Sequence, residues 1–242
     1  MTRWDRTKGR PEPIGALNRV KEVESGEPLV DLREVAPSVR QLRPQVIPYV
    51  RQRVAEMCEI AAQSLPSGYH LGLVEGWRPI ERQQRIYDFF WNAAVEAYPD
   101  RDFAALRRTV CRWVAPTDQK APPGHCTGAA VDVFLLDDND QTIDVTSPFD
   151  RFESAPTYTF GLSEVAQFNR TILVEAMLGA GFSNCRDEWW HYSFGDAGWA
   201  VRMGYSECPY GLAKIPFYLY EHLEKEHEED MKERVSPFLP RT

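Results

Sequence analysis

The chain contains no apolar run long enough to cross a bilayer and no Lys/Arg-rich stretch with interleaved aromatic residues. A membrane span needs roughly 18–20 consecutive apolar residues, so we expect no membrane-spanning segment. The formal net charge of −8 over 242 residues opposes binding to a polyphosphate backbone, which argues against nucleic acid as a partner. With 43% hydrophobic residues, a chain of this length can bury a full core without disulfides, as in a soluble globular protein.

Cysteine is scarce, and its spacing shows no pairing motif. The five cysteines include no C-x-x-C pair, and their odd number argues against a disulfide framework or a cysteine-rich zinc finger. The first 13 residues carry several cations and no apolar stretch, unlike a secretory signal. We therefore expect a cytoplasmic protein with reduced thiols that starts at Met1. The sequence carries no signal for an oligomeric state.

Apolar periodicity predicts an α+β fold. The expected helices span residues 49–64, 80–97, 102–114 and 164–179, and the expected strands span residues 70–75, 129–136, 143–145 and 188–194. Strands that pair as hairpins, with helices grouped rather than strictly alternating, indicate a single domain with a small antiparallel sheet flanked by helices. Residues 1–28 are predicted to form a polar N-terminal arm. Residues 29–242 form the predicted domain, which ends in an acidic helix.

The helix that follows Ser163 is predicted to start at that residue as its N-cap. Its expected inner face carries apolar side chains at helical spacing: Val165, Phe168, Ile172, Leu173, Ala176 and Met177.

Histidine is also scarce, with five residues, so a site that uses two of them has few solutions. His125 lies where a loop rich in Pro and Gly meets a predicted buried strand. Asp132 follows in that strand between Val131 and Val133, and a buried carboxylate needs a partner such as a divalent cation. On a straight strand, residues seven positions apart point to opposite faces, so we expect Gly128 to bend the chain and bring both side chains together.

A second cluster, at the start of a later predicted strand, supplies His191 and, three residues earlier, Glu188. Two His and one Asp leave a tetrahedral zinc ion one open position, as in catalytic sites, although the same set accepts other divalent metals. Glu188 could then be the base, and Arg78, at a predicted strand-to-helix junction, could stabilise an oxyanion.

Each of these residues, taken alone, also has an ordinary structural explanation. His125 could be a loop or core histidine, Asp132 could cap a turn, and Glu188 could pair with Arg186 at the surface. Cys126 could bind a metal or act as a nucleophile, but a buried thiol that faces the core is the favoured interpretation. The combination of clusters, more than any one residue, indicates a site.

That combination resembles the D-alanyl-D-alanine dipeptidases, which belong to a wider group of zinc peptidases with the D,D-carboxypeptidases and the Hedgehog fold. The matching motifs, in order, are GWRP at 76–79, H-x2-G-x-A-x-D at 125–132, SPFD at 147–150 and EWWHY at 188–192. The resemblance extends from about residue 50 to about residue 204. It implies a zinc cleft in the sheet of the α+β domain.

The resemblance implies a role for each matching residue. One zinc ion (Zn2+) per chain would be bound by His125, Asp132 and His191, with Glu188 as general base and then general acid. Arg78 would stabilise the transition state. The remaining implied residues concern specificity: Asp150 would pair with the free ammonium of a dipeptide substrate, and Pro123 stands where the family usually has Ser.

The function expected from these residues is zinc-dependent hydrolysis of D-Ala-D-Ala, or a related D-configured dipeptide, by a metal-activated water. This activity would serve peptidoglycan recycling or glycopeptide resistance. One alternative is a D,D-carboxypeptidase-type hydrolase acting on peptidoglycan stem peptides, which would need export. The other is a non-catalytic zinc-binding module of the same fold, which has no use for Glu188 or Arg78 beside the metal.

Overall fold

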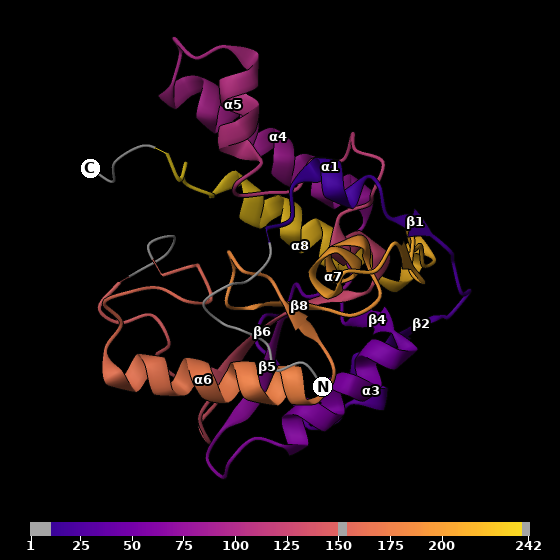
Figure 1. Cartoon of the computed structure of the whole chain (residues 1–242), viewed down its shortest axis with the longest axis vertical. Coiled ribbons are helices and arrows are strands. Elements are labelled where there is room, and N and C mark those ends of the chain that lie inside the picture. Colours follow the sequence, from indigo (N-terminus) through magenta and orange to yellow (C-terminus); the bar gives the residue numbers. More distant parts are fainter. Residues whose placement is uncertain (1–10, 150–153, 239–242) are drawn as a thin grey trace.

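A computed structural model describes residues 11–149 and 154–238 of the chain (Figure 1). The helices are α1 (Ile14–Leu17), α2 (Leu32–Val35), α3 (Gln52–Gln63), α4 (Ile80–Ala97), α5 (Phe103–Val110), α6 (Glu164–Gly179), α7 (Ala197–Met203) and α8 (Glu221–Lys232), with short 3-10 helices η1 (Gly124–Thr127) and η3 (Phe217–Leu219). The strands are β1 (Lys21–Glu22), β2 (Leu29–Asp31), β3 (Val39–Gln41), β4 (Tyr49–Arg51), β5 (His70–Glu75), β6 (Ala130–Leu136), β7 (Ser183–Asn184), β8 (His191–Ser193) and β9 (Glu207–Cys208). Within the described ranges, no helix has the length and apolar character needed to cross a membrane.

The central sheet has the strand order β3-β5-β6-β8-β7. Strands β5, β6, β8 and β7 pair antiparallel, and β3 joins the edge parallel to β5. The predicted α+β class with a small, mostly antiparallel sheet is therefore confirmed. The predicted strand at 70–75 and the predicted helix at 80–97 match β5 and α4 at both ends.

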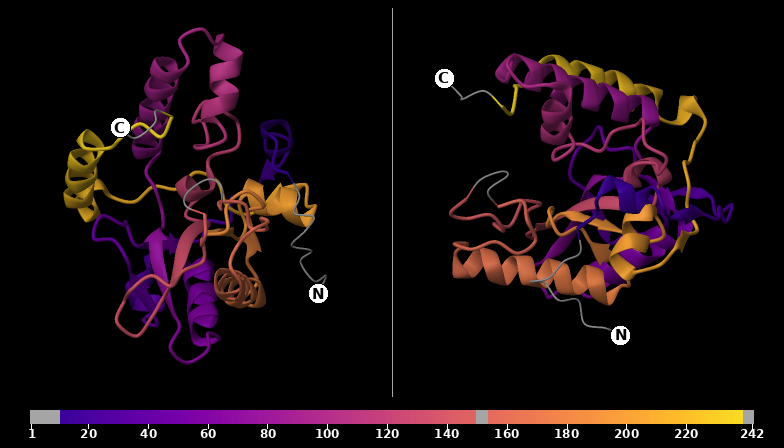
Figure 2. Two further views of the ribbon diagram at one scale, coloured as in Figure 1. Left: turned by 90° about the vertical axis from the view of Figure 1, so that its left-hand side faces the viewer. Right: turned by 45° about the horizontal axis from the view of Figure 1, so that its top comes forward.

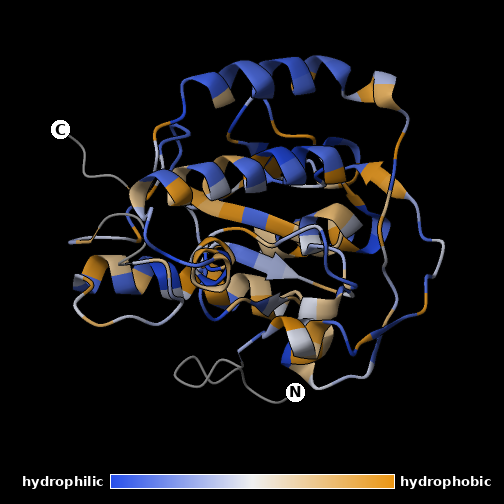
Figure 3. Ribbon diagram, turned by 90° about the horizontal axis from the view of Figure 1, so that it is seen from above, coloured by the Kyte–Doolittle hydropathy of each residue, from blue (hydrophilic) through white to orange (hydrophobic). Residues whose placement is uncertain are grey.

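Helices cover the two faces of this sheet unequally. Helices α3 and α6 lie along one face, while α4 and α8 lie side by side beyond the other (Figures 1 and 2). The main hydrophobic core lies between the sheet and the α3–α6 layer. On the opposite side, Arg82 of α4 donates a hydrogen bond to Glu224 of α8 over 2.6 Å. Both side chains are buried, although α8 carries mostly hydrophilic residues (Figure 3).

Three local expectations from the sequence are wrong. Residues 49–51 form β4, because they pair with β2, so the predicted helix begins at Gln52. Residues 143–145 form no strand. A single bridge between Leu136 and Thr142 takes the place of the predicted hairpin partner. The predicted strand 188–194 is limited to β8.

The second half of helix α6 buries Leu173, Ala176 and Met177 as the apolar pattern predicts, but its first half turns a different face inward. Ser163 caps the helix as expected, but Val165 and Phe168 are 65% and 61% exposed. The reason is Arg170, which is buried and donates hydrogen bonds to the backbone carbonyls of Val145 and Ser154. Because an unpaired buried charge would be costly, these hydrogen bonds favour an inward position for Arg170 over one for Val165 and Phe168.

Of the predicted N-terminal arm 1–28, the structure describes residues 11–28, which lie against the rest of the chain. Strand β1 pairs parallel with β9. Glu12 and Glu24 form ion pairs with the buried guanidinium groups of Arg202 and Arg51, at 2.7 and 3.0 Å. The domain boundary after residue 28 stays a prediction.

Candidate metal centre

Asp132 belongs to a strand whose other side chains are mostly buried. Val131, Val133 and Leu135 of β6 belong to the core beneath the sheet. Side chains alternate between the two faces of a strand, so Asp132 points to the opposite face. The apolar residues around this carboxylate therefore anchor the strand and direct Asp132 toward the α4 side.

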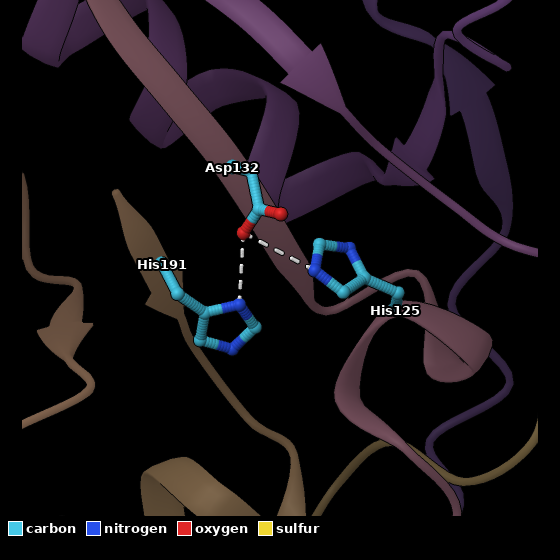
Figure 4. A group of neighbouring side chains, drawn as sticks. All are labelled: His125, Asp132 and His191. Atoms are coloured by element: carbon cyan, nitrogen blue, oxygen red, sulfur yellow. Dashed lines mark hydrogen bonds and ion pairs between the residues drawn. The ribbon is translucent and has the colours of Figure 1, made fainter. Parts of the chain in front are cut away.

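His191 lies directly opposite Asp132 on the neighbouring strand. The two residues are register partners in the β6–β8 ladder, so their side chains share a face. His191 Nδ1 lies 2.9 Å from Asp132 Oδ1 (Figure 4). Burial alone would lower the pKa of His191, but the hydrogen bond to the Asp132 carboxylate raises it.

His125 reaches the same point from η1, just before β6. Gly128, which ends this short helix, has a φ of 72°, a left-handed conformation that glycine adopts without strain. The bend expected at Gly128 is thus confirmed. His125 Nε2 lies 3.2 Å from Asp132 Oδ1, and the two imidazole rings meet edge to face with centroids 4.9 Å apart (Figure 4).

The hydrogen bonds around His125 make this group suitable for a cation. His125 Nδ1 lies 2.9 Å from the carbonyl oxygen of Gly76, and because a carbonyl only accepts, Nδ1 must carry the proton. Nε2 of the neutral ring then presents a lone pair toward the carboxylate of Asp132. The lone pair and the carboxylate repel each other unless a proton or a metal ion lies between them.

One ligand atom from each of His125, Asp132 and His191 lies within 4.8 Å of the others. Zinc bonds to His nitrogen and carboxylate oxygen are about 2.0–2.2 Å long, which places tetrahedral donors roughly 3.3–3.6 Å apart. The measured separations to Asp132, 2.9 and 3.2 Å, approach this spacing. Burial alone would raise the pKa of Asp132, but the two imidazoles hold it well below its usual range. The donor set and its geometry therefore fit a divalent metal.

Glu188 lies at the edge of this group. Its Oε2 is 3.9 Å from His191 Nδ1. Burial raises the pKa of Glu188, and the Asp132 carboxylate adds to the increase, although His191 opposes it. The expected alternative, a surface pair with Arg186, is not formed, because Arg186 pairs with Asp187.

Arg78 follows β5 and also faces the group. Its backbone N–H donates to the carbonyl oxygen of His125 over 3.1 Å, which ties the two segments together. Burial alone would lower the pKa of Arg78, but the carboxylates of Glu75 and Asp132 raise it. A charged guanidinium is thus held next to the candidate ligands.

Two other residues from the sequence analysis are not assigned to this group of ligands. Asp150 is outside the described residues. Cys126 is fully buried, and burial raises the pKa of its thiol to about 12, which supports the interpretation of a buried thiol that faces the core. Sequence reasoning missed Glu75 and Gln83, which both contact the Arg78 guanidinium. The signal in the sequence that could have identified them is their closeness to Arg78, three residues before it and five after it.

The fold and this constellation define an α+β protein with a sheet-borne His–Asp–His group next to a carboxylate and a guanidinium. A family model described as D-ala-D-ala dipeptidase matches residues 45–209, more than half of the chain. The chain therefore belongs to this family of peptidases, as the sequence motifs indicated.

Curated relatives agree with this assignment. The chain is 26% identical over 228 residues to the D-alanyl-D-alanine dipeptidase of Synechocystis sp., which covers 86% of this chain and 91% of the relative. It is 26% identical over 132 residues to the D-alanyl-D-alanine dipeptidase of Escherichia coli, with coverage of 54% and 58%.

A solved structure of a vancomycin resistance D,D-pentapeptidase, VanY, in complex with Zn(II) matches with 19% identity and a TM-score of 0.36. That match covers 60% of this chain and 72% of the other.

Proposed function

We propose that this peptidase hydrolyses D-Ala-D-Ala, or a related D-configured dipeptide, with one zinc ion per chain. The observation that carries the proposal is the convergence of His125, Asp132 and His191 within 4.8 Å, with Glu188 Oε2 3.9 Å from His191. Membership of the D-ala-D-ala dipeptidase family supports the substrate class. A purely structural zinc site is closed by four protein ligands, whereas this set of three leaves a position for the reaction.

His125, Asp132 and His191 would hold the zinc. When bound, zinc supplies Lewis acidity that makes water nucleophilic near neutral pH. The hydrogen bond from His125 Nδ1 to Gly76 fixes the tautomer that leaves Nε2 free as a ligand. The other ligand atoms come from opposed positions on two paired strands, so the sheet limits their movement.

Glu188 and Arg78 would do the remaining chemistry. The Glu188 carboxylate would accept a proton from the attacking water and return it to the nitrogen of the leaving amine. A raised pKa suits this second step, because it makes the protonated form of Glu188 more accessible. The Arg78 guanidinium would stabilise negative charge that develops on the carbonyl oxygen.

Asp150 is proposed to pair with the free ammonium of the substrate. A carboxylate at a fixed distance from the metal favours a substrate whose amino terminus lies one residue from the scissile bond, which is a dipeptide. We assign the reaction to the cytoplasm, as part of the metabolism of peptidoglycan-derived dipeptides. The five cysteines, all unpaired thiols in the structure, support a reducing compartment.

The test is the release of free amino acid from D,D-, L,D- and L,L-dipeptides, from N-acetylated D-Ala-D-Ala and from a stem pentapeptide. We expect zinc-loaded protein to cleave free D,D-dipeptides. Chelation should abolish the activity, and Glu188→Ala should lower kcat by about 10²–10⁴-fold while zinc stays bound. Asp187→Ala, which removes an exposed neighbouring carboxylate, is the matched control.

Other outcomes would replace the proposal. Cleavage of the pentapeptide in preference to dipeptides would indicate a D,D-carboxypeptidase. Stoichiometric zinc binding without cleavage of any of these peptides would indicate a binding module. Cleavage of N-acetylated D-Ala-D-Ala as fast as of the free dipeptide would refute the role of Asp150.

A further inference from the structure

Glu75 lies on the same face of the sheet as the candidate metal ligands because of a bulge in β5. Leu73 pairs with Val133 in the ladder, and Glu75 pairs with Asp132, so two positions along β5 match one along β6. Leu73 faces the core. Regular alternation would also direct Glu75 to the core, but the extra residue turns it to the Asp132 face. The strand is thus built to deliver a carboxylate to the site.

This carboxylate and a buried amide hold both ends of the Arg78 guanidinium. Arg78 Nη2 lies 3.3 Å from Glu75 Oε2, and Arg78 Nη1 donates to Gln83 Oε1 over 2.7 Å. Gln83, which is 1% exposed, is itself fixed by a 2.7 Å hydrogen bond from its Nε2 to the carbonyl oxygen of Ala115. Arg78 Nε is buried and has no hydrogen-bond partner among the described residues.

We propose that Glu75 and Gln83 are positioning residues that hold Arg78 in its catalytic orientation and keep it away from Asp132. The inference rests on the proposed function of Arg78 as the stabiliser of the oxyanion. With Nη1 and Nη2 each engaged by one partner, the guanidinium plane is fixed, and the second N–H of each terminal nitrogen remains as a donor for substrate.

The charges in this part of the sheet explain why such a clamp is needed. Glu75 and Asp132 are opposed on neighbouring strands, where like charges destabilise the pair unless a cation lies nearby. Arg78 is attracted to both carboxylates. Without Glu75, Asp132 would be the nearest strong anion, and an ion pair with it would withdraw Arg78 from the substrate and compete for a metal ligand.

The first test separates positioning from general damage by measuring each variant in two backgrounds. Glu75→Gln and Gln83→Met should each lower kcat about 10- to 100-fold with KM nearly unchanged, as for other supporting residues of active sites. In an Arg78→Ala background, neither change should lower kcat further by more than about twofold, because they act through the same group. The matched controls are Glu81→Gln and Gln84→Met, at two positions of α4, the helix that carries Gln83.

A second readout does not depend on turnover. In ¹⁵N spectra, the Nε–H signal of Arg78, assigned by its loss in Arg78→Lys, should be sharp and slow to exchange in the wild type. It should broaden or disappear in Glu75→Gln but persist in Glu81→Gln.

The outcomes distinguish this inference from the proposed function. Equal losses of kcat in the wild-type and Arg78→Ala backgrounds would overturn the clamp, as would an unchanged Arg78 Nε–H signal in Glu75→Gln. If the wild type cleaves no dipeptide, the proposed function fails, and the ¹⁵N spectra alone decide whether Glu75 fixes the guanidinium. The affinity of a phosphinate dipeptide analogue should fall by the same factor as kcat/KM.

Discussion

Substituting Gly128 with Ala should both destabilise the fold and disturb the metal centre. Gly128 has a φ of 72° and joins η1, which carries His125, to β6, which carries Asp132. An L residue in this conformation costs about 1–2 kcal/mol. A Cβ at this position would also overlap Cδ2 of Leu29, and displacing that side chain from its rotamer adds about 1 kcal/mol.

The expected total loss for Gly128→Ala is about 2–3 kcal/mol, which lowers the melting temperature of a chain of this size by roughly 4–12 °C. Gly68→Ala is the matched control, because Gly68 has a φ of 83° with no atom within 4 Å of its added Cβ. It should therefore show the backbone cost alone. The difference between the two variants isolates the contact with Leu29.

The assay combines urea unfolding with zinc titration of each variant. Gly128→Ala should bind zinc more weakly than the wild type, since the shift separates His125 from Asp132, whereas Gly68→Ala should bind zinc normally. Leu29→Ala should remove the extra cost of Gly128→Ala in the double variant. If Gly128→Ala costs no more than Gly68→Ala and binds zinc equally well, the assignment of Gly128 as the bend that assembles the site is refuted.

Three further results are expected. Zinc at about 100 times its dissociation constant should stabilise the protein by about 2.7 kcal/mol in thermal unfolding, and equal stabilisation of His191→Ala would contradict the ligand assignment. Burial, aided by the Arg82 cation, lowers the pKa of His227 to about 4, so the unfolded state binds the extra proton between its ordinary value of 6.5 and pH 4. The free energy of unfolding should therefore decrease by about 1–2 kcal/mol as the pH is lowered from 6.5 to 4. This figure is smaller than the full pKa shift would give, because the ring is partly exposed to solvent. Urea unfolding at a series of pH values should show a weaker pH dependence of stability for His227→Gln than for the wild type, with exposed His222→Gln as control. An unchanged pH dependence would show that His227 is not responsible for the loss of stability. Pro123→Ser, which restores the hydroxyl usual in the family, should raise kcat/KM for D-Ala-D-Ala relative to its C-terminal amide, and an unchanged ratio would show that position 123 does not recognise the carboxylate.

Apolar periodicity predicted best the elements that bury apolar side chains along their whole length. Strand β5 is an apolar segment bounded by turn residues, and α4 carries a full apolar stripe after Pro79, so both were predictable at both ends. Helix α6 was predicted in extent, but the inward face of its first half was not. Its buried face includes Asn169 and Arg170, which donate hydrogen bonds to backbone carbonyl groups of a loop some 25 residues earlier in the chain. The apolar pattern of the helix itself does not reveal hydrogen-bond partners that lie outside the helix.

The candidate site was predictable to the extent that its residues belong to compact motifs. His125, Asp132, Glu188 and His191 could be named from the sequence because each motif lies where a loop meets a strand. Glu75 could not, since its place depends on the ladder register, and a one-residue shift reverses every side chain on a strand. The pairing of β1 with β9 likewise joins segments too distant in sequence for local patterns to connect.

The register of three strands explains how one site can draw on residues so far apart in the chain. Glu75, Asp132 and His191 are successive partners across β5, β6 and β8, so they form one row on one face of the sheet. In the proposed site, the first carboxylate of this row contacts Arg78, the second would bind the metal, and the imidazole would be a further metal ligand. A change at either end of the row acts on Asp132 through a neighbour, which is why the metal ligands and the Arg78 clamp should behave as coupled groups in mutational cycles rather than as independent sites.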